Sequence, residues 1–279
     1  MKSRKTTWIL VLMFLAGVSL LLYPTVSDYW NSLHASQAVA AYAEDVHAME
    51  QDQYEDVLEQ ARAYNQTRSS KTMDFYLTDE EQQSYDSQLN VGGTGIIGYI
   101  EIPVIAISLP IYHGTSESVL QIAVGHLDWS SLPVGGESTH CVLSGHRGLP
   151  SAKLFTNLDE MKLGDTFVIR VLDEVLTYEV DQILIIEPTD TSALVIEQGK
   201  DLCTLMTCTP YGINSHRLLV RGHRIENPTE AKTIRLVADA VQVDTLVVAP
   251  IIAAPILLIL FVILLLPSRK QRNHRKDHS

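Results

Sequence analysis

The sequence predicts a mainly β domain, a barrel or a sandwich, held between two apolar segments at the ends of the chain. Short β-branched runs, broken by Gly, Pro, Asn and Asp, fill the middle of the sequence. One long uncharged apolar run lies near each end, and a stretch without Gly or Pro precedes the first strands. The 279 residues, 46% hydrophobic and 19% charged, suffice for one sizeable domain with additional segments.

The first apolar run covers residues 6–23 and comes after a basic N-terminus, residues 1–5. A signal peptide and a retained transmembrane helix both fit this pattern, and both would export the domain. The best small-x-small cleavage site, residues 38–40, lies well beyond the apolar run. We therefore favour a retained membrane anchor.

The second apolar run, residues 246–267, has 22 residues and no charge. A helix of this length crosses a hydrocarbon layer of about 30 Å, and so long a run argues against a buried core helix. The tail at 268–279 is basic, which places it in the cytoplasm by the positive-inside rule. We expect a two-pass protein in contact with membrane lipid, with both termini cytoplasmic and the folded domain outside the cell.

The charge between the two ends is strongly negative. This part of the chain holds 13 of the 21 Lys and Arg residues but 32 of the 33 Asp and Glu residues, a net charge of −19. Such a surface does not bind nucleic acid through its phosphates. We also find no phosphate-binding glycine pattern and no paired-cysteine metal motif, so no cofactor and no metal are predicted.

Two segments are expected between the first apolar run and the strands. Residues 24–64 have a helix-compatible apolar pattern and are read as a stem of one or two helices. Residues 65–91 are polar and form a candidate lid or linker. The strand-rich domain then covers residues 92–228, and a connector at 229–245 leads to the second apolar run.

Within the domain, six apolar runs have the length of strands: 98–102, 139–144, 166–171, 176–185, 202–207 and 217–221. Helical turns are expected near 116–124 and 151–158. The strands and their turn signals leave a barrel and a sandwich as alternatives.

Cys208 is the candidate nucleophile among three cysteines. It falls at the end of a buried strand and before a turn, where a thiol is partly exposed and rigidly held. Cys141 and Cys203 lie inside apolar runs and are expected to be small buried residues.

Two further residues have the chemistry to act with a thiol. Arg217 opens the next apolar run, and a hairpin between the two runs would place it opposite Cys208 as an oxyanion clamp. His146 lies in a glycine-flanked loop after another strand. Spacing alone does not choose between it and three other histidines of the domain, His113, His126 and His216.

A family resemblance makes this choice. Residues 204–208, TLMTC, resemble the TLxTC signature of sortases, and residues 204–222, TLMTCTPYGINSHRLLVRG, resemble the class C, pilin-polymerising subfamily. The runs IYHGT, GHL, SLPVGGESTH and GHRGLPSA, at 111–115, 125–127, 131–140 and 145–152, are also similar to it.

The resemblance implies an eight-stranded closed barrel with short helices, flanked here by the stem helices and two transmembrane helices. It implies Cys208 as nucleophile, His146 as general acid and base, and Arg217 as the clamp. The implied partners are pilin proteins with LPxTG-like sorting signals and an acceptor lysine amine of another pilin. Class C sortases resemble one another in a lid with an Asp-Pro-aromatic motif, and here Asp74 and Phe75 are the candidate lid residues, without the proline.

Three alternatives stay open. A cell-wall-anchoring sortase would use an amine of the peptidoglycan cross-bridge on the same barrel. An L,D-transpeptidase also combines Cys, His and Arg, but its SxGC-like motif is absent around Cys208. An inactive membrane-tethered binding module would not need the intact set of Cys208, His146 and Arg217.

Overall fold

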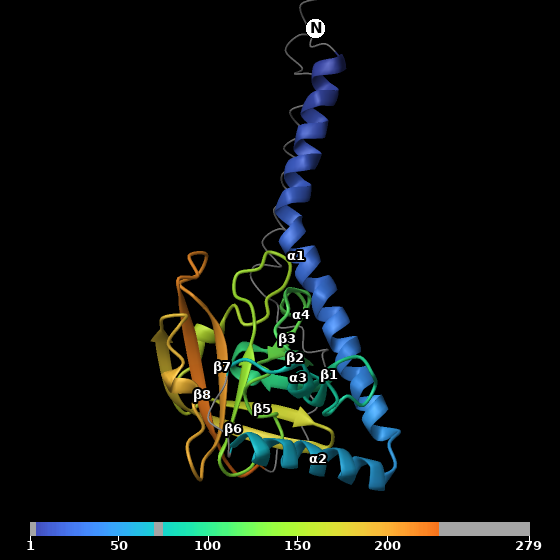
Figure 1. Ribbon diagram of the computed structural model, residues 1–279. Helices are drawn as coiled ribbons and strands as arrows, with labels where there is room; N and C mark the ends of the chain where they lie inside the picture. The colour runs from blue at the N-terminus through green and yellow to red at the C-terminus, as the bar shows by residue number, and fades with distance from the viewer. Residues whose placement is uncertain (1–3, 70–74, 229–279) are drawn as a thin grey trace, which may run out of the picture. The chain divides into compact units, whose positions relative to one another are not determined.

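The structure, a computed structural model, describes residues 4–69 and 75–228 (Figure 1). The described residues divide into two units, one of residues 4–27 and one that begins at residue 28. The second predicted membrane segment, 246–267, lies outside the described residues, as do the connector and the basic tail.

The N-terminal apolar run is helical. It belongs to helix α1 (Arg4–His47), which continues through Pro24 into the region predicted as the stem. Within the part of the chain that the structure describes, α1 is the one helix long and apolar enough to cross a membrane, and the side chains of its apolar window are not buried. A first membrane anchor is consistent with this helix, whereas the two-pass arrangement stays a prediction.

Helix α2 (Gln51–Ser69) completes the stem and packs on the barrel. Its buried side chains are Leu58, Ala61 and Asn65. The amide of Asn65 donates to the carbonyl of Leu132 at 3.0 Å and accepts from the same residue's N–H at 2.8 Å. A buried backbone group needs such a partner, so this pair fixes where α2 lies.

The segment predicted as lid or linker contains helix α3 (Asp79–Asp86). Thr78 and Glu81 form a capping box, in which each side chain accepts a hydrogen bond from the other's backbone N–H. Tyr85, fully buried, anchors α3 by donating to Nδ1 of His126 at 2.8 Å. This part of the segment is therefore docked on the barrel by Tyr85, and Leu89, which follows the helix, is also buried in the core.

Eight strands form a closed barrel, as the family resemblance implied, in the order β1-β2-β3-β4-β7-β8-β6-β5 (Figure 1). Closure pairs every strand on both sides and removes the exposed sheet edges. The strands are β1 (Ile96–Ile102), β2 (Ile107–His113), β3 (Val124–His126), β4 (Thr139–Ser144), β5 (Thr166–Val171), β6 (Glu174–Ile186), β7 (Asp201–Thr209) and β8 (His216–Arg224). The short helices are η1 (Pro103–Ile105), α4 (Glu117–Leu120), η2 (Leu158–Glu160) and η3 (Ser192–Leu194).

Six of the strands coincide with the predicted runs, and β2 and β3 were not among them. Strand β2 contains Pro110, and a proline within a run argues against a strand because it cannot donate to the ladder. Strand β3 has only three residues, too few for an alternating pattern. Both strands are fixed by pairing with neighbours, which a local pattern does not record.

The two faces of the central strands pack into different clusters. Side chains of β7 alternate, so that Cys203 and Leu205 join the barrel core while Met206 packs on the opposite face. A second cluster on that face, here called the outer cluster, consists of Leu127, Val142, Leu194 and Leu219. The barrel core fixes the strands, and the outer cluster covers the sheet face that carries the candidate site.

Candidate active site

The hairpin of β7 and β8 places Cys208 directly opposite Arg217 in the antiparallel register. Side chains so paired stand on the same face, with Cβ atoms about 4.5–5.5 Å apart. The preceding pair on this face is Met206 with Leu219, which belong to the outer cluster region. The thiol and the guanidinium therefore lie at one end of that face, as the hairpin hypothesis expected.

The turn between the strands fits its sequence. Its backbone closes through the N–H of Asn214, which donates to the carbonyl of Pro210 at 2.9 Å. Gly212 and Asn214 adopt positive φ angles of 74° and 60°, conformations that glycine and asparagine tolerate best. The turn is thus compatible with the register that pairs Cys208 with Arg217.

His146 reaches the same end of the sheet from β4. Strands β4 and β7 are parallel, and Ser144 pairs with Met206. The N–H of Gly145 donates to the carbonyl of Met206 at 3.1 Å, so the pairing extends beyond the strand. Continued by two residues, this register brings His146 level with Cys208, since neighbouring strands are about 4.8 Å apart.

Two contacts hold the backbone around His146. The hydroxyl of Thr207 donates to the carbonyl of Gly145 at 2.7 Å, and the N–H of Phe155 donates to the carbonyl of His146 at 3.1 Å. A Cβ atom at Gly145 would lie 2.7 Å from the Phe155 ring, so only glycine permits this approach. The GHRG run is thus a close-packed loop.

The guanidinium of Arg217 is held by its own hairpin. Its Nη1 donates to the carbonyl oxygens of His216 at 3.1 Å and Asn214 at 3.4 Å. Within residues 4–69 and 75–228, no carboxylate pairs with Arg217. The neighbouring His216 is engaged elsewhere, with its Nε2 3.2 Å from a carboxylate oxygen of Glu187.

The other histidines considered from the sequence lie away from Cys208. His113 and His126 pair with each other on β2 and β3. His126 is fully buried, with its Nε2 donating to the carbonyl of Ser131 at 2.8 Å. Burial lowers the pKa of His113. Both imidazoles serve the docking of Tyr85 and α3, a structural role.

Cys141 and Cys203 are free, buried and paired in register on β4 and β7. Burial raises the pKa of the Cys203 thiol well above its usual value. Cys208, by contrast, is partly exposed. A reactive thiol needs access, so Cys208 is the cysteine placed for chemistry.

A buried histidine braces the segment between β6 and β7. Nδ1 of His140 donates to the carbonyl of Val195 at 2.8 Å, and its Nε2 accepts from the hydroxyl of Thr204 at 2.7 Å. Arg221 forms a second contact with this segment, an ion pair in which its Nη1 lies 2.7 Å from Oε1 of Glu197. These bonds hold the segment that supplies Leu194 to the outer cluster.

The candidate lid residues divide between described and undescribed parts of the chain. Asp74 lies outside the described residues. Phe75 packs edge-to-face on Trp129, with ring centroids 5.0 Å apart. Trp129 itself packs against the outer cluster, and its carbonyl accepts from Arg68 at 2.9 Å.

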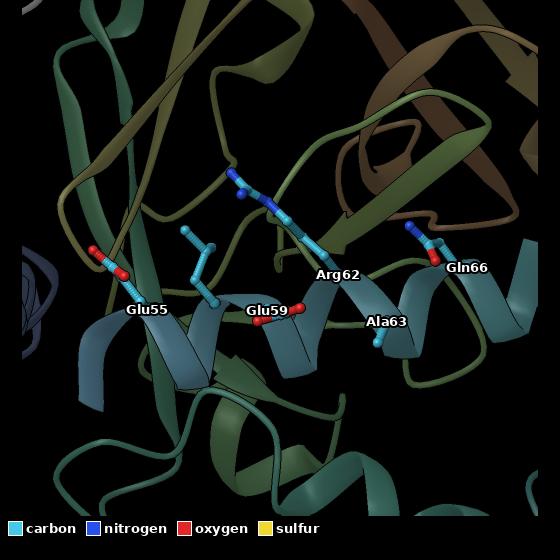
Figure 2. Close-up of a pocket in the computed structure, with 6 residues that line it drawn as sticks. Glu55, Glu59, Arg62, Ala63 and Gln66 are labelled. Carbon is cyan, nitrogen blue, oxygen red and sulfur yellow. The ribbon is translucent and has the colours of Figure 1, made fainter. Parts of the chain in front are cut away.

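A pocket of about 440 Å³ lies elsewhere, along α2 (Figure 2). Its six lining residues all come from that helix, and four of them are Glu55, Glu59, Arg62 and Gln66. Arg62 pairs with Glu174 at 3.6 Å. This lining has no nucleophile and belongs to none of the strands that carry the candidate site. In the described part of the chain, no group of three or more His, Cys, Asp or Glu residues is placed to hold a metal ion.

Comparison with known proteins identifies the family of the domain. A family model described as the sortase domain matches residues 100–225, which include Cys208, His146 and Arg217. Sortase D from Bacillus subtilis is 33% identical over 131 residues, which cover 46% of this chain and 63% of that protein's length.

Solved structures extend the similarity to most of the domain. Sortase C1 from Streptococcus agalactiae is 50% identical, with a TM-score of 0.68, and the match covers 69% of this chain and all of that one. Sortase C from Streptococcus pneumoniae is 45% identical, with a TM-score of 0.61, over 68% and 97% of the two chains. Sortase C from Clostridium perfringens, solved with the C-terminal cell wall sorting motif, is 42% identical, with a TM-score of 0.62, over 69% and 100%.

The chain belongs to the sortase family, a family of cysteine transpeptidases. The solved structures that it resembles at 40–50% identity include several class C sortases.

Sequence reasoning missed several residues around the site, among them Trp129, His140 and Arg147. His140 carried a usable signal, because a polar residue inside an apolar strand needs a buried hydrogen-bond partner. Trp129 and Arg147 lie in loops, where no periodic pattern indicates what they contact.

Proposed function

We propose that the chain is a class C sortase that joins pilin subunits through a thioacyl intermediate on Cys208. The observation that carries this proposal is the position of Cys208 between two neighbouring strands. It pairs with Arg217 of β8 on one side, and on the other it is level with the end of β4, which leads to His146. A thiol nucleophile, an imidazole and a fixed guanidinium are the groups that acyl transfer requires.

In the first half-reaction, the Cys208 thiolate attacks the threonine carbonyl of an LPxTG-like sorting signal. Negative charge develops on the carbonyl oxygen, where Arg217 donates hydrogen bonds. The Thr–Gly bond breaks, and the His146 imidazolium protonates the leaving glycine amine. A thioester between Cys208 and the substrate threonine remains.

In the second half-reaction, a neutral amine attacks the thioester carbonyl. The carbon–sulfur bond breaks, the imidazole of His146 takes a proton from the amine, and the thiolate is regenerated. A lysine amine of another pilin yields a covalent pilus. An amine of the peptidoglycan cross-bridge would instead anchor the protein to the wall, and water would release it.

The outer cluster supports a sorting signal as the acyl donor. Its four buried side chains are bordered by the partly exposed apolar side chains of Leu184, Ile186 and Met206, on the sheet face that ends in Cys208 and Arg217. This apolar surface suits the leucine and proline of an LPxTG-like signal, because full burial of a side chain of leucine size is favourable by about 1.5–3 kcal/mol. The Clostridium perfringens sortase C solved with its sorting motif supports the same substrate class.

Incubation of the full-length protein with candidate pilins tests the proposal. Pilins with LPxTG-like tails should form covalent ladders on denaturing gels, and the same pilins with the signal deleted should not. Addition of a cross-bridge peptide should not divert the product. Release of cleaved pilin without ladders, or transfer to the cross-bridge peptide alone, would contradict pilin polymerisation.

We further propose that residues 65–91 include a lid and that the enzyme is anchored in the cell membrane. Phe75 on Trp129 would hold the lid beside the outer cluster. Helix α1 would provide the first membrane anchor, and residues 246–267 the second.

A further inference from the structure

Arg147 is a nearly buried cation in the loop that carries His146. Its side chain is 10% exposed and pairs with Asp159 of η2. Its Nη1 donates to the hydroxyl of Thr209 at 3.3 Å, and the guanidinium carbon lies 5.9 Å from the centre of the Tyr211 ring. A charge withdrawn from water is costly unless its partners are well placed, so this position is not an ordinary surface arginine.

The residues on both sides of Cys208 hold the His146 loop. Thr207 donates to the carbonyl of Gly145, and Thr209 accepts from Arg147. Thr207 and Thr209 are buried and share the face of β7 opposite that of Cys208, because strand side chains alternate. His146 therefore lies between Gly145 and Arg147, which bond to Thr207 and Thr209. These two threonines lie on either side of Cys208 in β7.

Arg147 also joins this loop to two further segments. Asp159 connects it to η2, and Tyr211 to the turn between β7 and β8. The neighbouring Gly148 packs closely on the same ring, since a Cβ atom there would lie 3.0 Å from Tyr211. One guanidinium thus contacts the histidine loop, the end of the cysteine strand and the turn that leads to Arg217.

We propose that Arg147 is a positioning residue that sets the placement of His146 relative to Cys208 through Thr209 and Asp159. This inference rests on the proposed roles of His146 and Cys208. Proton transfer requires heavy atoms within about 2.6–3.2 Å, and a displacement of about 1 Å costs on the order of a hundredfold in rate. Loss of the tie at Thr209 would leave the loop held at Gly145 alone on the β7 side.

The first test is steady-state kinetics of the full-length protein with a sorting-signal peptide. Arg147→Met, which keeps an apolar stem but removes the donors, should lower kcat at least about tenfold with little change in KM. Arg147→Lys, which keeps the charge and one donor to Thr209, should recover part of the loss. Thr209→Val should lower kcat in the same sense, because it removes the acceptor.

Arg170→Met is the matched control for the loss of a buried cation. The Arg170 side chain is also 10% exposed and pairs with a buried carboxylate, Glu101, at 3.1 Å, but it joins β5 to β1. It should lower the unfolding midpoint at least as much as Arg147→Met while kcat stays near that of the wild type. An equal loss of kcat in the two variants would overturn the proposal.

The second test does not depend on any substrate. The rate at which iodoacetamide alkylates Cys208 is measured between pH 5 and 9 in four proteins: wild type, Arg147→Met, His146→Gln and the double variant. Arg147→Met should move the pH profile toward that of His146→Gln and should change nothing further in the His146→Gln background. Equal effects in both backgrounds, or an unchanged profile in a folded Arg147→Met protein, would overturn the positioning role. If alkylation of Cys208 depends on Arg147 through His146 in this way but the wild-type protein does not cleave the peptide, the proposed function is refuted and the positioning role of Arg147 stands.

Discussion

Phe75 packs edge-to-face on Trp129, with the two ring planes at 80°. Trp129 in turn packs on the outer cluster, and Arg68 of α2 donates to its carbonyl. An edge-to-face aromatic pair contributes about 0.5–1.5 kcal/mol beyond its buried area. A contact of this size holds a segment in place and still permits it to open.

The first prediction concerns this contact as a lid latch. Replacement of Asp74 and Phe75 by alanine together should speed alkylation of Cys208 by a small thiol reagent, because the covering segment loses its contact. The melting temperature should change little, since Phe75 is 36% exposed. Tyr76→Ala, at a side chain that is 85% exposed, is the control and should not alter the rate. Unaltered alkylation in the folded double variant would show that this segment does not cover the site.

The second prediction separates the three cysteines. Cys208→Ala should abolish ladder formation, because it removes the nucleophile. Cys141→Ala and Cys203→Ala should retain activity and cost about 1 kcal/mol of unfolding free energy each, a usual value for loss of a small buried group. Ladders from the Cys208→Ala protein would contradict the assignment of the nucleophile.

The third prediction concerns the chemistry of Arg217. Arg217→Lys keeps the charge but loses the planar set of donors, so it should lower kcat by on the order of a hundredfold or more. Arg221→Lys is the matched control, because Arg221 lies on the same strand and the same face but binds Asp181 and Glu197. A near-normal rate for Arg217→Lys together with a slow Arg221→Lys would mean that the clamp has been assigned to the wrong residue.

The sequence was most informative about contacts between segments that are close together along the chain. The runs at 202–207 and 217–221, with turn residues between them, predicted the hairpin, and a hairpin of that length pairs Cys208 with Arg217. The position of His146 was not accessible in this way. It depends on the parallel pairing of β4 with β7, which are separated by two other strands along the chain, and only the family resemblance chose it.

The contacts around the site were the least predictable part. Arg147 reaches Thr209, Asp159 and Tyr211 from three separate segments, and no spacing in the sequence relates them. The polar segment 65–91 looked like a linker because α3 is short and polar. Its docking depends on buried residues such as Tyr85 and Leu89, and His126, the hydrogen-bond partner of Tyr85, lies 41 residues further along the chain.

The fourth prediction is the membrane topology. If residues 1–5 and 268–279 are both cytoplasmic, protease added to intact protoplasts should digest the domain at 27–245 and spare tags at both ends. The tags should become sensitive only after the membrane is permeabilised. Cleavage of the C-terminal tag from outside would contradict the second membrane segment, and cleavage of the N-terminal tag would contradict the first.

The last prediction is a loss of stability in mild acid that originates in part at His140. Burial lowers the pKa of His140, a change opposed by its bond to the Val195 carbonyl and increased by Arg221. The neutral ring donates from Nδ1 to the carbonyl of Val195 and accepts at Nε2 from the hydroxyl of Thr204. Protonation would place a hydrogen on Nε2, which would then point at the hydroxyl hydrogen of Thr204.

Because the folded pKa lies below the unfolded value, the unfolded chain binds the proton first as pH falls. Stability is therefore complete above the ordinary histidine pKa of about 6.5 and declines below it, by up to about 1.4 kcal/mol per pH unit for each such group. His113, whose pKa burial also lowers, adds to this decline. Buried Glu101 and partly buried Asp201, whose pKa values are raised by removal from water, act in the opposite sense at lower pH.

Urea unfolding at pH 7.5 and pH 5.5 measures the effect. The wild type should lose unfolding free energy over this interval, and His140→Gln should lose less, because an amide retains a donor and an acceptor but does not titrate. His216→Gln is the control, since that imidazole is 39% exposed and lies outside the buried contacts of His140, and it should leave the decline unchanged. An equal decline in the wild type and His140→Gln would show that the acid sensitivity arises at other groups.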